Sequence, residues 1–113
     1  METFPRKENN IDRIKNHLSV FLTFEELSLE TLENRDFIFS IYNAMKNSYK
    51  ELPILLKEYD GVEDFNQFSI ATLLLDNYLK GYKSAKDVLR AKKDLGTEKT
   101  VYKILCIIEN APL

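Results

Sequence analysis

The stretch from Asp64 to Gly81, DFNQFSIATLLLDNYLKG, most constrains the fold, because it is apolar on almost every side of a helix. At the helical spacing of about 100° per residue, only a narrow polar strip remains, and it is built from Ser69, Asp76 and Lys80. A surface helix buries one stripe, whereas this one needs neighbours on two or three sides. The sequence therefore predicts a central helix over residues 64–81, surrounded by the other helices of an all-α domain.

Helix start and stop signals recur along the chain. The expected N-terminal caps are Asn10, Thr23, Asn34, Asp64, Ser84 and Thr97, and the expected stops are Asp60-Gly61, Gly81 and Gly96. Pro53 either kinks the helix that begins at Arg35 or starts a new short helix over residues 53–59. These signals predict a compact single-domain bundle of five or six helices over residues 1–113, with residues 1–9 frayed.

The bulk composition is ordinary for a cytosolic globular protein, with 44% apolar and 30% charged residues in 113 positions. A single cysteine cannot form an internal disulfide, and the first ten residues contain no apolar core of a signal peptide. The longest apolar runs are far shorter than the ~20 residues that span a bilayer. We therefore expect a cytoplasmic protein with no membrane partner.

The sequence contains no set of residues that matches a catalytic or ligand-binding chemistry. His17 is the one histidine and Cys106 the one cysteine, whereas a structural zinc site needs about four such ligands. The carboxylate pairs Glu25-Glu26 and Glu63-Asp64 lie at expected helix N-termini, where they complement the helix dipole. The three glycines fit turns and helix ends and form no phosphate loop. We expect no enzyme activity, no cofactor and no bound metal.

Charge is distributed unevenly along the chain, which is the best functional hint in the sequence. Residues 24–64 contain ten acids and four bases, a net charge of −6, whereas residues 80–103 contain eight bases and three acids, a net charge of +5. Complementary charge steers a protein toward its partner. The leading expectation is a small non-enzymatic protein that acts through protein–protein interaction, as inhibitors, immunity proteins, chaperones and adaptors do. The same asymmetry would let two copies pair, acidic half to basic half.

Residues 85–105 resemble a helix-turn-helix motif: a capped helix, a leucine before Gly96, a short polar turn and a second helix. The resemblance implies a DNA-binding regulator as the alternative function. It places at the major groove Thr97, Glu98, Lys99, Thr100, Tyr102 and Lys103, and near phosphates Lys86, Arg90 and Lys93. The chain departs from the motif at Lys92, where the motif has a small buried residue, and its turn is one residue short. A tight helical hairpin has the same sequence pattern. The candidate residues for contact with a partner protein or DNA are Lys83, Lys86, Arg90, Lys93, Lys99, Tyr102 and Lys103.

Two side chains fall outside the apolar seams of their helices. We expect Phe39 to contact a second helix, with an exposed anchor for a partner as the alternative. We expect Cys106 to pack on another helix as an inert apolar residue, with a thiol made reactive by nearby lysines as the alternative. If the protein-binding hypothesis holds, the face with Lys99 and Tyr102 should be partly covered by another helix, and a hydrophobic patch near Phe39 or Tyr82 should be open instead. If DNA is the partner, one exposed face should carry Lys86, Arg90, Lys99 and Lys103, with Gly96 in a tight turn.

Overall fold

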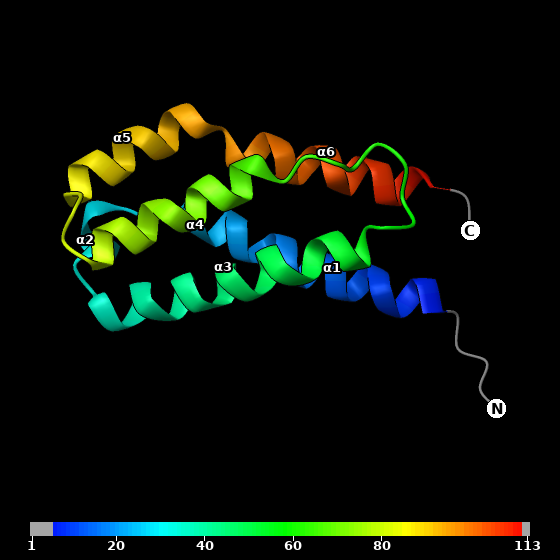
Figure 1. Ribbon diagram of the computed structural model, residues 1–113, viewed down its shortest axis with the longest axis horizontal. Helices are drawn as coiled ribbons and strands as arrows, with labels where there is room; N and C mark the ends of the chain where they lie inside the picture. Colours follow the sequence, from blue (N-terminus) through cyan, green and yellow to red (C-terminus); the bar gives the residue numbers. More distant parts are fainter. Residues whose placement is uncertain (1–5, 112–113) are drawn as a thin grey trace.

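The structure, a computed structural model, describes residues 6–111 and is all-helical in that range (Figure 1). Its helices are α1 (Arg6–Glu25), α2 (Leu29–Leu32), α3 (Arg35–Leu55), α4 (Asn66–Leu79), α5 (Ala85–Leu95) and α6 (Thr97–Asn110). The predicted all-α, single-domain bundle of five or six helices is confirmed, with six helices in the described residues.

Four arms run along the long axis of a molecule that measures 50 × 28 × 18 Å (Figure 1). α1 and α3 run antiparallel, α4 returns alongside α3, and α5 and α6 follow one another as the fourth arm. α1 packs mainly on α3 and α6, whereas α4 packs on α3 and α5. The one-turn helix α2 lies at the end of the bundle where α1 passes into α3 (Figure 1).

The core is built from one apolar stripe of each arm. The rings of Phe21 on α1 and Phe68 on α4 stack with their centroids 4.1 Å apart and their planes 19° apart. The other side chains that are completely buried include Ile14, Phe24, Leu32, Ile38, Met45, Leu52, Leu75, Val88 and Val101. Each large apolar side chain buried in this way contributes about 1.5–3 kcal/mol of hydrophobic stabilisation.

α4 has the central position that the sequence predicts, but it is covered on fewer sides. It contacts α1, α3, α5 and α6 and buries Phe68, Ala71, Leu74 and Leu75. Ile70 and Leu73 were expected in the core and are instead 46% and 55% exposed. The reason is that the bundle provides no helix to cover this side of α4, which therefore faces solvent.

Three predicted helix boundaries are confirmed by local geometry. The side chain of Asn34 accepts a hydrogen bond from the backbone N–H of Phe37 at 3.1 Å, which caps α3. Ser84 and Asp87 form a reciprocal capping box at the start of α5. Gly81 follows the end of α4 with φ of +85°, a left-handed conformation that glycine adopts without steric cost.

The boundaries of α1 differ from the prediction. The helix begins at Arg6 instead of following a cap at Asn10, so residues 6–9 are helical and not frayed, while residues 1–5 lie outside the described range. α1 also continues past Leu22 to Glu25. The Thr23 hydroxyl donates to the carbonyl oxygen of Ser19 at 3.1 Å, as a mid-helix threonine does, and does not open a capping box.

The connection from α3 to α4 also differs from the prediction. α3 runs through Pro53 to Leu55, so no separate helix begins at the proline, which is accommodated in the last turn. Asp64 accepts from the backbone N–H of Asn66 at 2.9 Å and so forms a local turn, in place of the expected capping box with Gln67. α4 therefore begins at Asn66 without a side-chain cap.

Candidate functional site

The basic candidates on α5 and α6 lie on the outer side of the fourth arm, except Lys103, which lines a hollow beside α6. The exposed members are Lys86, Arg90, Lys93, Lys99, Tyr102 and Lys103, whereas Lys83 is half-buried in the turn before α5. Lys86, Arg90 and Lys93 lie opposite the buried Val88 of α5, and Lys99 lies opposite the buried Val101 of α6, at helical spacing. The expectation that another helix partly covers the face with Lys99 and Tyr102 is wrong, because that face points away from the bundle.

α5 and α6 do not have the arrangement of a helix-turn-helix. Gly96 alone joins them, with φ of +68°, and they follow one another along the long axis (Figure 1). The motif instead has a turn of about 3–4 residues and helices that cross at about 90–120°. Thr97, expected at the DNA surface, is completely buried. The pair is not a tight hairpin either, because α5 packs on α4 and α2 while α6 packs mainly on α1.

Lys92, which departs from the helix-turn-helix pattern, is buried and bonded to the end of α1. Its ammonium group donates to the carbonyl oxygens of Glu25 at 2.5 Å and Leu27 at 2.8 Å. Burial lowers the pKa of Lys92, and the nearby Glu25 carboxylate partly offsets this effect. A cation at a helix C-terminus also complements the dipole. Lys92 is therefore a structural residue and contributes nothing to the outer basic face.

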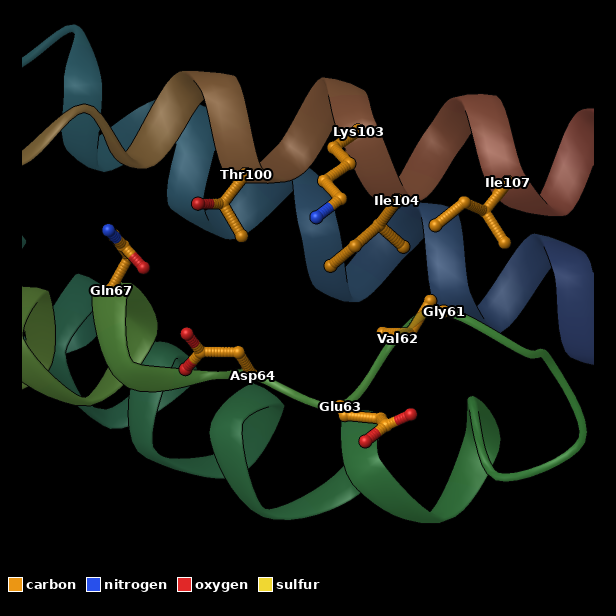
Figure 2. A pocket seen from close by; sticks show the side chains of 9 residues that line it. All are labelled: Gly61, Val62, Glu63, Asp64, Gln67, Thr100, Lys103, Ile104 and Ile107. Atoms are coloured by element: carbon orange, nitrogen blue, oxygen red, sulfur yellow. The ribbon is translucent and has the colours of Figure 1, made fainter.

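A hollow of about 260 Å³ lies between α6 and the segment that precedes α4 (Figure 2). Val62, Ile104 and Ile107 supply its apolar wall, and its polar side chains are Glu63, Asp64, Gln67, Thr100 and Lys103. Figure 2 shows the carboxylates on the loop and Lys103 on α6, on opposite sides of the hollow. Its volume is below the range of about 300–1,000 Å³ typical of ligand sites. Its mixed charge favours no single ligand class.

A second groove, of about 230 Å³, lies between α3 and α4, and we call it the α3–α4 groove. Its lining residues are Tyr42, Tyr49, Ser69, Thr72, Leu73 and Asp76. Tyr49 is 40% exposed and Leu73 is 55% exposed, and Ile70 lies one turn before Leu73 on the same side of α4. Large apolar side chains gathered at a groove are typical of binding surfaces.

Positive charge dominates the edge of the α3–α4 groove. The Asp76 carboxylate lies 3.0 Å from the ammonium nitrogen of Lys80, and the hydrogen bond between them lowers the pKa of Asp76 and raises that of Lys80. Lys46 lies over the Tyr42 ring, 5.0 Å from its centroid, and Lys50 is exposed one turn further along α3. Neither Lys46 nor Lys50 forms an ion pair within residues 6–111.

The sequence does not predict this groove, because helical periodicity assigns its apolar residues to the core. Tyr42, Tyr49 and Leu73 all belong to the apolar faces predicted for their helices. The available signal was that α4 is apolar on more sides than a small bundle can cover. Helical periodicity alone does not identify which of those sides remains open.

Three side chains that the sequence singled out line neither of these two hollows. The Nδ1 atom of His17 on α1 is 2.8 Å from the Ser48 hydroxyl on α3, a contact that joins the two helices. Phe39 is 56% exposed and Cys106 is exposed, so the expectation that each packs on another helix is wrong. Both lie on the outer sides of their helices, which have no neighbour there within the described residues.

Comparisons of the chain with protein-family models, with curated proteins and with solved structures find no match. Within residues 6–111, no helix combines the length and apolarity needed to cross a bilayer. His, Cys, Asp and Glu side chains of that range form no group of three that could hold a metal ion. A function must therefore be inferred from the surfaces of the chain itself.

Proposed function

We propose that this chain is a small non-enzymatic protein that acts by binding another protein through the α3–α4 groove. The observation that carries the proposal is a set of exposed apolar side chains: Tyr49 and Leu73 line this groove, and Ile70 lies beside it, three residues before Leu73 on α4. Full burial of an exposed side chain of this size is worth about 1.5–3 kcal/mol, and covering one that is already half-buried is worth roughly half of that. A partner that covers all three would gain a substantial part of its binding free energy there.

The helices that form the groove are well suited to present a binding surface. α3 and α4 pack against each other along the groove and bury their opposite sides in the core. Side chains on helices held in this way need little further ordering when a partner binds, which reduces the entropic cost of association. The Tyr49 ring also provides large contact area with few rotatable bonds, as binding hot spots often do.

Charge on the rest of the surface would guide such an encounter. The outer face of α5 and α6 is basic, whereas exposed acids lie around α2 and in the segment between α3 and α4. The acidic half of the sequence is thus divided between separate parts of the molecule (Figure 1). Surface charges separated in this way affect the rate of association and the choice of partner more than they affect the affinity.

The alternative function, a helix-turn-helix regulator, has support from the exposed cations of α5 and α6. Five exposed lysine and arginine side chains on these helices would meet phosphates. However, the two helices follow one another as one arm and do not cross (Figure 1). We therefore place DNA binding second, as an outcome that the test below can reveal.

Capture from a lysate of the encoding organism tests the protein-binding proposal with three immobilised forms. These forms are the wild type, Leu73→Lys, and the matched control Ile54→Lys, whose native side chain on α3 is 65% exposed and outside the groove. We expect a protein that the wild type and the control retain and that Leu73→Lys loses. Equal retention by all three forms, or retention of nucleic acid alone, would contradict the proposal.

A further inference from the structure

We infer that the partner segment bound in the α3–α4 groove is an amphipathic helix with acidic side chains beside its apolar stripe. This inference rests on the proposed function and specifies the chemistry of the partner. It follows from two properties of the groove, the arrangement of its apolar side chains and the excess of lysine at its edge.

The apolar side chains are arranged in a way that suits a helix. Tyr49 comes from α3 and Leu73 from α4, so a bound segment would contact both helices at once. Ile70 continues the apolar surface along α4 by three residues, which is about 4.5 Å at a rise of 1.5 Å per residue. An amphipathic helix that carries apolar anchors at i, i+3 or i+4 and i+7 matches a surface of this kind.

The charges around the groove favour an acidic partner. Lys46, Lys50 and Lys80 are exposed near its edge, whereas Asp76 is the one carboxylate among its lining residues. Lys80 already pairs with Asp76 at 3.0 Å, whereas Lys46, which lies over the Tyr42 ring, and Lys50 form no ion pair within the described residues. Acidic side chains at the flanks of a bound helix would meet these lysines, while a basic helix would be repelled.

A bound helix would not disrupt the hydrogen bonding of Thr72 in the groove. The Thr72 hydroxyl donates to the carbonyl oxygen of Phe68 at 2.8 Å, within α4 itself. Covering a donor that is already satisfied avoids the desolvation cost of about 1–3 kcal/mol for a polar group left unpaired. An apolar side chain can therefore lie against this part of the groove.

A second copy of the chain is a poorer occupant of the groove than an acidic helix. Symmetric pairing through this surface would bring the edges of two identical grooves together. Lys46 and Lys50 of both copies would then lie in one interface, which doubles its excess positive charge, and like charges in an interface are unfavourable. The acidic helix avoids this repulsion.

Two synthetic helices provide the test. Both have about 18 residues and the same leucine stripe, and they carry either glutamate or lysine at the flanking positions. Fluorescence anisotropy measures the binding of each peptide to the full chain. We expect the acidic peptide to bind at least about tenfold more tightly than the basic one. Tighter or equal binding of the basic peptide, or no binding of either, would overturn the inference.

Substitutions in the protein locate the binding site of the acidic peptide. Leu73→Lys should weaken its binding by about tenfold or more, because it removes an apolar anchor. Lys46→Glu and Lys50→Glu should each weaken it about threefold, whereas the matched control Lys57→Glu, at an exposed lysine beyond α3, should leave it unchanged. Equal effects of all three charge reversals would overturn the inference. Each variant is first shown by circular dichroism to melt as the wild type does.

Two outcomes separate this inference from the proposed function. If neither peptide binds but lysate capture still depends on Leu73, the inference is wrong and the proposed function stands. If capture does not depend on Leu73, the proposed function fails. Concentration-dependent self-association that Leu73→Lys removes, measured by sedimentation, would show that a second copy occupies the groove and would also overturn the inference.

Discussion

The ammonium group of Lys92 on α5 donates a hydrogen bond to the main-chain carbonyl oxygen of Leu27 at 2.8 Å, just beyond the end of α1. The same group donates to the carbonyl oxygen of Glu25, the last residue of α1. Carbonyl groups at the end of a helix have no partner within the helix and must be satisfied from outside. One buried side chain therefore joins two segments that are more than 60 residues apart in sequence.

Replacing Lys92 with methionine should destabilise the protein by about 1–3 kcal/mol, because the buried carbonyl oxygen of Leu27 and the partly buried one of Glu25 lose their donor. Methionine keeps most of the volume and apolar length of the lysine side chain. Urea denaturation measures the change in the free energy of unfolding. The matched control is Lys93→Met at the exposed neighbouring position, for which we expect a change within about 0.5 kcal/mol. Equal effects of the two substitutions would show that the Lys92 hydrogen bonds contribute nothing.

The stability of the protein should depend on pH through His17. Burial lowers the pKa of His17 below its ordinary value of 6.5, with Glu51 opposing this effect and Arg13 adding to it. The unfolded state therefore binds a proton first as the pH falls below 6.5, and stability decreases across that window. We expect His17→Asn to reduce this dependence, measured by urea denaturation at about pH 5 and pH 7. An unchanged slope in the variant would contradict the assignment.

The stacked pair Phe21 and Phe68 should be the most sensitive part of the core. Phe21→Ala removes a completely buried ring that contacts α4 and should cost about 3–5 kcal/mol of stability. Phe39→Ala is the matched control, because that ring is largely exposed on α3. We expect the control to change the free energy of unfolding by about 0.5 kcal/mol or less. Thermal or urea unfolding followed by circular dichroism would distinguish the two, and a large loss at Phe39 would indicate a different packing.

The Cys106 thiol should react with iodoacetamide in the native protein, because it is exposed on the outer side of α6. Intact-mass spectrometry would show one added group without denaturant. Cys106→Ser should show none under the same conditions. Labelling that requires unfolding would mean that another surface covers this side of α6, for example in an oligomer.

The sequence was sufficient to predict the fold class because the signals involved are local. Ser84, Gly81 and Asn34 define helix ends through residues a few positions away, and all three are confirmed. The false signals were also local: Thr23 and Asp64 matched capping patterns, but their hydrogen bonds go elsewhere. A pattern of residue types cannot show which of two local bonds a side chain forms.

The candidate groove was not predictable from the sequence, because it depends on which helix faces remain uncovered. Ile70 and Leu73 have the same residue types as buried neighbours on α4, and only the number of packed helices separates them. The role of Lys92 was hidden for a related reason. The carbonyl oxygens that it meets come from a distant segment, whereas a lysine on a basic helix is expected to face water.

The most direct test of the proposed function is photo-crosslinking in living cells. A benzophenone amino acid is placed at the position of Leu73 in one variant and at that of Ile54 in the other. Both native side chains are exposed, but only Leu73 lines the α3–α4 groove. We predict a covalent adduct with a discrete protein from the groove position and none from the other. No adduct at either position, the same adducts at both, or adducts with nucleic acid alone would contradict protein binding through this groove.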